Sequence, residues 1–539
     1  MPCPAPDRDR TEAAGGTGTV VPVTSHDPAA VIILAAGEGT RMKSATPKVL
    51  HRIGGRTLLG HALHAARQAA PRHLAVVVRH ERDRVAAHVE ETDAQALVAD
   101  QDEVKGTGRA CECGLDVLPA DLRGTVLVTM GDVPLLTGDT LRDLTERHER
   151  SGAAVTVITA ELPDAKSYGR VVRDDAGDVV AIMEFKDALR HREAGDEWSH
   201  VVDVREINSG IYAFDAELLR SALGRVGTDN AQGEKYLTDV VAIAREEGRR
   251  VVAHLVDDQW QTEGVNDRVQ LAELGRELNR RTVEHWMREG VTVVDPATTW
   301  IDADVTIGPD TVVRPHVQLL GATTVGSEAV VGPDTTLTDT VVGDGASIVR
   351  TQAELAVVGE GASVGPFSFL RPGTELGAGG KIGGFVETKN ARIGEGAKVP
   401  HLTYCGDATI GEGANIGAGT IFANYDGVAK HRTTVGRHSF VGSDSVLIAP
   451  VDIADGAYVA AGSAIEGRVG PGQIGVARGR QRNVDGWVAR RRAGTPTARA
   501  AEEALAAERA ADGAPAPGEG APQTPAARTD DASTPTQES

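Results

Sequence analysis

The sequence is poor in cysteine and in positive charge. Its 539 residues include four cysteines, whose spacing fits neither a zinc site nor a disulfide framework. Lysine and arginine number 56 against 77 acidic residues, and the net charge of −21 argues against nucleic-acid binding through a general basic surface. Local clusters of lysine and arginine can still bind phosphate groups inside an acidic protein.

Long apolar runs are also absent. No stretch reaches the roughly 20 residues that cross a membrane, and the N-terminus lacks the apolar segment of a secretory signal. We therefore expect a soluble, cytoplasmic protein with reduced cysteines and no membrane partner. Cys111 and Cys113 are expected to be packing residues of a helix. Aromatic residues make up only 3% of the chain, which suits a core filled by Val, Ile, Leu and Ala.

The chain is too long for one typical core, and its composition changes along its length. Both ends are rich in small, polar and charged residues and are expected to be disordered. A helix from about residue 267 to 289 is expected to connect two folded parts. The predicted segments are a disordered extension at 1–29, an α/β domain at 30–264, a linker helix at 265–292, a repeat domain at 293–490 and a disordered tail at 491–539.

Buried strands alternate with helices in the first folded part, which predicts a mostly parallel, Rossmann-like sheet. The apolar runs that predict its first four strands lie at 31–36, 74–78, 96–98 and 126–129. Ligands on such sheets bind beyond the carboxyl ends of the strands. The glycine-rich loop 37–41 follows the first strand, and Asp132 follows the fourth. A ligand site is therefore expected at this edge.

The loop Gly37-Glu38-Gly39-Thr40-Arg41 is not a Walker loop, because no Gly-Lys-Ser/Thr closes it. It is not a dinucleotide fingerprint either, because Met42 stands where a third glycine would be needed. Glycines directly after a buried strand still let backbone N–H groups approach phosphates. Arg41 and Lys48 add positive charge. A plain glycine turn is the alternative for the loop alone, but the string from Leu34 to Met42, followed by Pro47-Lys48, is more specific.

An apolar residue, aliphatic at all positions but Phe422, recurs at every sixth position over much of 301–465. The series comprises Ile301, Ile307, Val313, Leu319, Val325, Val331, Leu337, Val358, Val364, Leu370, Leu376, Ile382, Ile410, Ile416, Phe422, Val435, Val441, Leu447, Ile453, Val459 and Ile465. A period of six fits neither a helix nor an alternating strand. It predicts a triangular coil of stacked parallel strands with one inward residue on each face. The count loosens between Ile382 and Ile410 and is interrupted after Phe422.

The glycine loop resembles the signature of the sugar-1-phosphate nucleotidyltransferases, which join a nucleoside triphosphate to a sugar 1-phosphate. With the hexad repeat, nearly the whole ordered chain resembles the bifunctional N-acetylglucosamine-1-phosphate uridyltransferase/glucosamine-1-phosphate acetyltransferases. The resemblance implies that the repeat is a left-handed parallel β-helix. It also implies two reactions of UDP-N-acetylglucosamine synthesis, which supplies peptidoglycan and the cell wall.

For the α/β domain, the resemblance implies transfer of UMP from UTP to N-acetylglucosamine 1-phosphate. Asp132 and Asn266 match the family's ligands for Mg²⁺, which prefers oxygen donors. Arg41 and Lys48 would stabilise the triphosphate. The implied nucleotide-sugar-binding residues are Leu34, Ala35, Ala36, Gly37, Lys48, Gln101, Gly106, Thr107, Met130, Gly131, Asp132, Gly169, Glu184, Asn208 and Asn266.

Within this set, the resemblance implies that the uracil is bound by Gln101, Gly106 and Thr107. It implies that the sugar is bound by Gly169, Glu184 and Asn208. Met130 departs from the family pattern, in which an aromatic residue often stands at this position. For Asp132 the alternative role is a helix cap or a turn residue.

For the repeat domain, the resemblance implies acetyl transfer from acetyl-CoA to glucosamine 1-phosphate. An amine must lose a proton to attack, and a histidine suits that task. His401 is the candidate base, with an ordinary surface or core histidine as the alternative. The implied sugar-phosphate ligands are Arg371, Lys389, Tyr404 and Asn415, and the implied acetyl-CoA ligands are Ala418, Asn424, Tyr425, Ser443, Ala461 and Arg478.

The resemblance further implies a homotrimer with acetyl-transfer sites between subunits and only small-molecule substrates. Two other interpretations stay open from the residues. One is a nucleotidyltransferase whose β-helix only oligomerises or regulates, which would have no use for the motifs at 401–404 and 424–427. The other is a non-enzymatic binding module, which would need neither the glycine loop nor Asp132.

Overall fold

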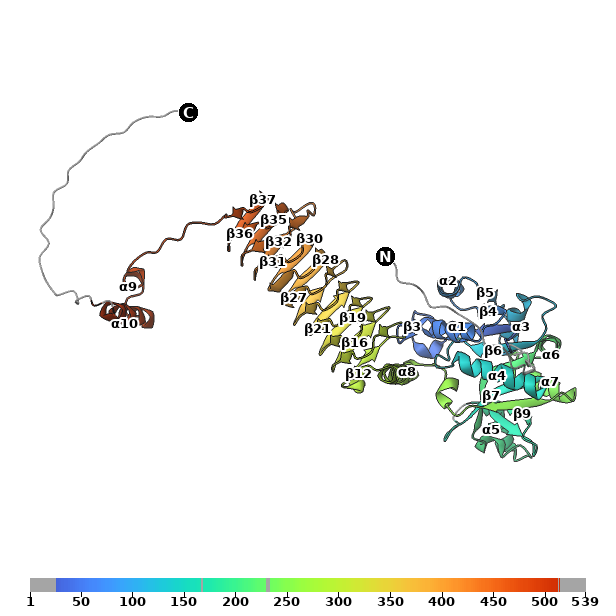
Figure 1. Ribbon diagram of the computed structural model, residues 1–539. Coiled ribbons are helices and arrows are strands. Elements are labelled where there is room, and N and C mark those ends of the chain that lie inside the picture. Colours follow the sequence, from blue (N-terminus) through green and yellow to red (C-terminus); the bar gives the residue numbers. More distant parts are fainter. Residues whose placement is uncertain (1–25, 166–167, 229–232, 512, 514–539) are drawn as a thin grey trace, which may run out of the picture. The chain divides into compact units, whose positions relative to one another are not determined.

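The computed structural model describes residues 26–165, 168–228, 233–511 and 513. The contacts divide the chain into two compact units, Met1–Ala477 and Arg478–Ser539. The first unit carries an α/β fold in its N-terminal half and a long stack of short strands in its C-terminal half (Figure 1). The predicted disorder of the two ends falls largely on residues 1–25 and 514–539, which lie outside the described residues.

A nine-stranded sheet forms the N-terminal half, with the order β11-β7-β10-β6-β1-β4-β5 and with β8 and β9 attached beside β10. Its strands are β1 (Ala30–Leu34), β4 (His73–Val78), β5 (Leu97–Asp100), β6 (Thr125–Met130), β7 (Val155–Glu161), β8 (Arg170–Arg173), β9 (Val179–Met183), β10 (Glu206–Asp215) and β11 (Val251–Leu255). The strands β1, β4, β5 and β6 pair in parallel, as the sequence predicts, whereas β10 runs antiparallel to β6 and β7.

Helices cover both faces of this sheet. They are α1 (Leu58–Gln68), α2 (Arg82–Thr92), α3 (Thr107–Asp116), α4 (Gly138–Ser151), α5 (Phe185–Ala194), α6 (Ala216–Leu223) and α7 (Asp239–Glu246). One apolar cluster joins the sheet to α3, α6 and α7, and a second joins it to α1, α2 and α4. Ile32 points into the first cluster and Ile33 into the second, so β1 is buried on both faces. Cys111 and Cys113 pack in the first cluster, which confirms their predicted role.

The C-terminal half of the first unit is a parallel β-helix. One face consists of β12 (Thr292–Val293), β15 (Val312–Val313), β18 (Val330–Val331), β21 (Ser347–Ile348), β24 (Ser363–Val364), β27 (Lys381–Gly384), β29 (Lys398–His401), β31 (Asn415–Ile416), β34 (Phe440–Val441), β36 (Tyr458–Val459) and β38 (Ile474–Gly475). Every pairing within this face is parallel. One turn of the coil separates each partner pair, as in Val313 and Val331.

The other two faces share one sheet because longer strands bend around a corner of the coil. The second face holds β13 (Trp300–Ile301), β16 (Val317–Leu320), β19 (Thr335–Thr338), β22 (Thr351–Glu354), β25 (Ser368–Leu370), β28 (Glu387–Ile393), β30 (Tyr404–Ile410), β32 (Ile421–Ala423), β35 (Val446–Ile453) and β37 (Ala464–Val469). The third holds β14 (Thr306–Ile307), β17 (Thr324–Val325), β20 (Val341–Val342), β23 (Val357–Val358), β26 (Glu375–Leu376) and β33 (Thr433–Val435). The strands β28, β30 and β35 extend onto this third face, where β28 pairs with β26. Together the faces form the triangular coil that the period of six predicts, and the coil is consistent with the left-handed parallel β-helix that the resemblance implies.

The inward residues of the hexad series form one continuous core, which confirms the sixfold pattern. The predicted loosening of the count between Ile382 and Ile410 is confirmed, although the coil itself continues through this segment. Thr388, Ile393, Val399 and Cys405 are its inward residues, each at most 2% exposed. The steps from Thr388 to Ile393 and from Cys405 to Ile410 are one residue short, and the threonine and the cysteine break the aliphatic pattern. The interruption after Phe422 is confirmed as a loop between β32 and β33.

Helix α8 (Arg268–Arg288) joins the two folds, as predicted. Asp267 caps it by accepting hydrogen bonds from the backbone of Val269 and Gln270. Its buried Asn279 donates to the carbonyl of Thr299 at 2.8 Å and accepts from the backbone N–H of Ile301 at 2.9 Å. These two bonds fix the first coil of the β-helix to the helix.

The predicted disorder from residue 491 onwards is wrong for part of the tail. Helix α9 (Trp487–Arg491) and helix α10 (Pro496–Ala511) lie in the second unit. The segment of α10 is rich in Ala, Glu and Arg, which have high intrinsic helix propensity. Among the described residues, no helix is both long and apolar enough to cross a membrane.

Candidate active sites

The glycine loop after β1 brings Lys48 against the edge of the sheet. Gly39 has a left-handed φ of 60°, and a Cβ atom there would lie 2.5 Å from the Cβ of Lys48. Glycine is therefore required for the close approach of the loop to the side chain of Lys48. The ammonium group of Lys48 forms an ion pair with the carboxylate of Asp132, which follows β6. The backbone N–H of Gly131 donates to the carbonyl of Leu34 at 2.9 Å and so joins the ends of β6 and β1.

A cavity of 420 Å³ opens at this edge of the sheet. Its lining includes ten of the predicted nucleotide-sugar-binding residues, namely Leu34, Ala35, Ala36, Gly37, Lys48, Gln101, Gly106, Thr107, Met130 and Asp132. Arg79, Lys105 and Glu234 also line the cavity, and the sequence reading missed all three. No motif marked them, because they are charged residues in segments that only the fold brings to this edge.

A backbone hydrogen bond brings the segments of the two predicted metal ligands, Asp132 and Asn266, close together. The N–H of Val265 donates to the carbonyl of Asp132 at 2.9 Å, which places the neighbouring Asn266 beside the end of β6. The guanidinium group of Arg41 donates to the Oδ1 atom of Asn266 at 2.7 Å. Asp132 and Asn266 thus each direct an oxygen atom to a cationic side chain.

The loop that holds Gly106 is fixed by several hydrogen bonds. Gly106 has a φ of 115°, and a Cβ atom there would lie 2.2 Å from the carbonyl oxygen of Lys235, so glycine is required. The side-chain amide of Gln101 donates to the carbonyls of Val104 at 2.9 Å and Gly106 at 3.2 Å. The hydroxyl of Thr107 accepts from the backbone of Leu237 at 3.1 Å. Gln101 and Thr107 therefore shape this part of the cavity wall.

The three residues predicted to hold the sugar come together beside β8 and β10. The backbone of Asn208 donates to the carbonyl of Gly169 at 2.9 Å, and a Cβ atom on Gly169 would lie 3.7 Å from the Oε1 atom of Glu184. Burial, followed by the charges of Asp187 and Asp239, raises the pKa of Glu184. The buried hydroxyl of Tyr212 donates to Oδ1 of Asn208 at 2.8 Å and fixes its amide.

Met130 lies between the three predicted sugar-binding residues and the cavity. Its side chain lines the cavity, and its Cε atom would lie 2.9 Å from a Cβ atom on Gly210, a residue of the same strand as Asn208. Met130 therefore fills, with a flexible apolar side chain, the position where the family pattern often has an aromatic residue.

The β-helix places four predicted residues of the acetyl-transfer site in one row. The carbonyl of His401 accepts from Gly419 at 3.2 Å, that of Ala418 from Asp444 at 2.8 Å, and that of Ser443 from Gly462 at 2.8 Å. His401, Ala418, Ser443 and Ala461 consequently occupy equivalent positions on successive coils. His401, Ser443 and Ala461 are exposed and Ala418 is half-buried, so an extended ligand can lie along the row.

The predicted phosphate ligands gather at one corner of the coils that precede and adjoin the row. The backbone of Arg371 donates to the carbonyl of Thr388 at 2.9 Å, which aligns Arg371 with Lys389 one coil further on. Lys389 in turn pairs in register with Gly406. Lys430, from the loop after Phe422, lies against Lys389, and together with Arg371 it lowers the pKa of Lys389. Lys430 therefore joins the cationic cluster.

Tyr404 and Asn424 lie beside this cluster. The side-chain amide of Asn424 reaches the hydroxyl of Tyr404 at 3.4 Å. Hydrogen bonds within the loop that follows hold its conformation. The hydroxyl of Tyr425 donates to the carbonyl of Gly427 at 2.7 Å, and the Nε2 atom of His431 is hydrogen-bonded to Oδ2 of Asp426 at 2.7 Å. Asn415 lies on the face of His401, between Lys398 and Phe440 in the register. Within one chain, the predicted residues are thus spread over two neighbouring faces.

Comparisons with known proteins cover both the α/β fold and the β-helix. Residues 31–176 match the model of the MobA-like NTP transferase domain family. The chain is 57% identical over 494 residues to the bifunctional protein GlmU of Micrococcus luteus, with 91% of this chain and 99% of that relative covered. It is 59% identical to the GlmU protein of Kineococcus radiotolerans, covering 88% of the chain and 95% of the relative. The match to that of Streptomyces avermitilis is 58%, covering 88% and 97%.

The chain belongs to the bifunctional GlmU family. It is therefore a bifunctional transferase of UDP-N-acetylglucosamine synthesis, with uridyltransferase and acetyltransferase activities that serve peptidoglycan synthesis. The matched nucleotidyltransferase domain contains the glycine loop, Lys48 and Asp132. The relatives extend the match across the β-helix, which contains His401 and the cationic cluster.

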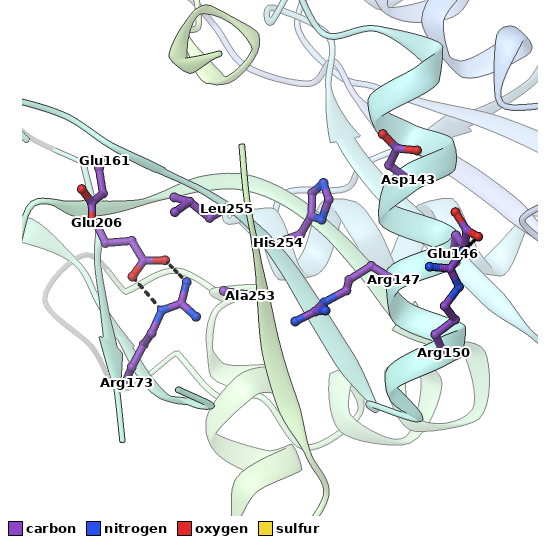
Figure 2. A pocket seen from close by; sticks show the side chains of 10 residues that line it. All are labelled: Asp143, Glu146, Arg147, Arg150, Glu161, Arg173, Glu206, Ala253, His254 and Leu255. Atoms are coloured by element: carbon purple, nitrogen blue, oxygen red, sulfur yellow. Dashed lines mark hydrogen bonds and ion pairs between the residues drawn. The ribbon is translucent and has the colours of Figure 1, made fainter. Parts of the chain in front are cut away.

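One further cavity of this GlmU family member lies away from both sites. It has a volume of 740 Å³ and lies between α4 and the edge strand β11 (Figure 2). Two of its arginines pair with glutamates: Arg150 with Glu146, and Arg173 with Glu206, whose Nε and Oε2 atoms lie 2.7 Å apart. None of the predicted site residues lines this cavity, so we assign it no part in either reaction. Arg478, the last predicted acetyl-CoA ligand, belongs to the second unit and stays a prediction.

Proposed function

We propose that the two sites act in sequence on one sugar. The β-helix acetylates the amine of glucosamine 1-phosphate with acetyl-CoA, and the α/β site then transfers UMP from UTP to the N-acetylglucosamine 1-phosphate formed. The row of His401, Ala418, Ser443 and Ala461 next to a cationic corner is the observation that carries this proposal. A β-helix that served only to oligomerise would need neither feature.

In the α/β site, we propose that Asp132 and Asn266 hold Mg²⁺. The donor set fits, because one carboxylate and one amide oxygen are hard ligands of the kind that Mg²⁺ takes while it keeps several waters. Both oxygens already face cationic side chains, Lys48 and Arg41. When bound, Mg²⁺ would neutralise negative charge on the phosphates.

No protein nucleophile is needed for UMP transfer. The phosphate oxygen of the sugar attacks the α-phosphorus of UTP, the bond to the β-phosphate oxygen breaks, and pyrophosphate leaves. Lys48 and Arg41 stabilise the charge that builds on the leaving group. Gly106 lets the loop of Gln101 and Thr107 approach the uracil, while Gly169, Glu184 and Asn208 hold the sugar. These residues orient two polyanions that would otherwise repel each other.

In the β-helix site, we propose that His401 is the general base. It removes a proton from the amine as the amine nitrogen attacks the thioester carbonyl of acetyl-CoA, and CoA leaves as its thiol after protonation. Arg371, Lys389 and Lys430 bind the 1-phosphate of the sugar, which is bound next to Tyr404. Acetyl-CoA lies along the row of Ala418, Ser443 and Ala461, with Asn424 and Tyr425 beside it. Asn415 shares the face of His401 and positions the sugar.

The spread of these residues over two faces of one chain supports a homotrimer in which neighbouring subunits complete each acetyl-transfer site. We propose that residues 30–264 form the uridyltransferase domain, 265–292 the linker and 293–490 the acetyltransferase domain. We also propose that the protein works in the cytoplasm, where UTP and acetyl-CoA are available.

Two variants, each assayed for both reactions, test the assignment of one reaction to each site. Asp132→Ala should lose UDP-sugar formation by at least about 100-fold and keep acetylation, whereas His401→Ala should do the reverse. Asp139→Ala and His438→Ala are matched controls, because both remove exposed side chains elsewhere in the same domains. Normal acetylation by His401→Ala would show that the second site is wrongly placed.

A further inference from the structure

Asp407 lies at the corner of the β-helix between the two groups of acetyl-site residues. Its Oδ1 atom accepts from the side-chain amide of Asn390 at 2.7 Å, and its Oδ2 atom accepts from that of Asn424 at 2.6 Å. Both carboxylate oxygens are thus occupied by amide donors. Asn424 is only 6% exposed and also approaches the hydroxyl of Tyr404, so its orientation depends on Asp407.

The same carboxylate faces the cationic cluster. Asp407 is half-buried, and burial opposes its ionisation, yet the bonds from Asn390 and Asn424 and the charges of Lys430 and Lys389 lower its pKa overall. Contact with Lys430 and the charge of Arg371 lower the pKa of Lys389, while Asp407 raises it. Arg371 is itself paired with Glu387 at 2.9 Å. Asp407 is therefore the carboxylate that offsets the repulsion between the two lysines.

We propose that Asp407 is a positioning residue of the acetyl-transfer site. Its carboxylate holds Asn424 in place for acetyl-CoA and keeps Lys389 and Lys430 close together and charged for the phosphate of the sugar. One residue thereby couples the binding of the two substrates. The proposal rests on the proposed acetyl-transfer function of this site.

A comparison with another corner aspartate distinguishes this role from a structural one. Asp339 has a left-handed φ of 46°, close to the 50° of Asp407, on a coil nearer the N-terminus. The carboxylate of Asp339 accepts a bond from the backbone N–H of Ala322 at 2.8 Å, which secures the corner itself. Asp407 instead accepts from two side chains. The bond from Asn390 joins two neighbouring corners, but the bond from Asn424 serves a residue of the site, and Asp339 has no such bond to a site residue among the contacts of the described residues.

Replacing Asp407 with asparagine tests the proposal. Asparagine tolerates the left-handed conformation, so the corner is preserved. It has one acceptor oxygen for two amide donors, and its own NH₂ group would face one of them. We expect kcat/KM of acetyl transfer to fall about 10- to 100-fold, as for the loss of a charged hydrogen bond, with a higher KM for both substrates. Asp339→Asn should keep wild-type acetylation.

The pH profile supplies a readout that a structural role would not change. Without the charge of Asp407, Lys430 and Arg371 lower the pKa of Lys389 further, so Lys389 loses its proton at a lower pH. The alkaline limb of kcat/KM for glucosamine 1-phosphate should shift to lower pH in Asp407→Asn and stay in place in Asp339→Asn. Uridyl transfer, measured on the same samples, should change by less than about twofold.

The possible outcomes distinguish a failure of the proposed acetyl-transfer function from a failure of the role proposed for Asp407. If wild-type protein does not acetylate glucosamine 1-phosphate, the proposed function fails and this inference fails with it. If wild type acetylates and Asp407→Asn matches Asp339→Asn, only the role of Asp407 is overturned. A loss of acetylation in Asp407→Asn without a shifted alkaline limb, or together with a loss of uridyl transfer, would also overturn it, since Asp407 would then be merely structural.

Discussion

Lys48 and Asp132 form an ion pair in the lining of the 420 Å³ cavity, and Arg41 donates a hydrogen bond of 2.7 Å to Asn266. Each predicted metal ligand is thus in contact with a side chain that is also predicted to bind phosphate. Metal and phosphates would separate these pairs, because Asp132 and Asn266 would turn to the cation and Lys48 and Arg41 to the triphosphate. Until then the ammonium group of Lys48 neutralises the carboxylate of Asp132.

Lys48→Met should lower kcat of uridyl transfer about 100-fold, because a charge that stabilises the leaving pyrophosphate is lost. The concentration of Mg²⁺ that gives half-maximal activity should not rise, since Lys48 no longer competes for the carboxylate of Asp132. Steady-state assays over a Mg²⁺ titration measure both quantities. Lys43→Met, at an exposed lysine of the same loop, is the control. Equal activity of the two variants would contradict the assignment.

Glu184→Gln should stabilise the protein at neutral pH while it weakens sugar binding. Burial raises the pKa of Glu184, so the folded protein holds this proton more tightly than the unfolded chain does. The contribution of Glu184 to stability therefore falls as the pH rises from about 4.5 through the raised pKa. The variant should have a higher Tm than wild type at pH 7 and an equal one near pH 4.5.

The same variant should raise KM for N-acetylglucosamine 1-phosphate about tenfold, because an amide replaces a charged acceptor. Glu193→Gln, at an exposed position of α5, is the control for both measurements. A Tm at pH 7 no higher than that of the control would show that Glu184 is not held in a desolvated state.

Ala461→Leu should raise KM for acetyl-CoA about tenfold or more and leave uridyl transfer unchanged. Ala461 is exposed at the end of the row that begins with His401, and a larger side chain there would push an extended ligand off the coil. Ala322→Leu places the same side chain on an exposed alanine of a coil nearer the N-terminus. An unchanged KM in Ala461→Leu would mean that acetyl-CoA binds elsewhere.

Ile393→Ala should destabilise the β-helix by about 2–5 kcal/mol, the usual cost of emptying a buried isoleucine position. Ile393 is 2% exposed and lies in the segment where the sixfold count is irregular. Urea-induced unfolding of the variant and of Arg392→Ala, an exposed neighbour, gives the difference. A cost below about 1 kcal/mol for Ile393→Ala would show that this segment lies outside the core.

Local patterns were enough to predict most of the fold. The buried run at β1 predicts a strand covered on both faces, and the hexads predict the coil, because both depend on burial that repeats along the chain. The inward Thr388 and Cys405 were missed, since a short step and a polar side chain hide the period. Helix α10 was missed because a composition typical of disorder also has high helix propensity.

Less of the candidate sites than of the fold can be predicted from the sequence. Motifs make Lys48, Asp132 and His401 candidates, but Arg79, Lys105 and Asp407 carry no motif. The spacing between distant segments is fixed by the sheet and by the coil, so only the folded chain brings these charges together. The pairing of Lys48 with Asp132 likewise follows from the close approach at Gly39 and could not be inferred from their separation in the sequence.

The most direct test of two independent sites in one chain is a mixing experiment. Asp132→Ala and His401→Ala, purified separately, are each incubated with glucosamine 1-phosphate, acetyl-CoA, UTP and Mg²⁺, and then combined. Each alone should form no UDP-N-acetylglucosamine, and the mixture should form it, because the first variant releases N-acetylglucosamine 1-phosphate for the second. A mixture as inactive as its components, with both proteins folded, would contradict the assignment of one reaction to each site.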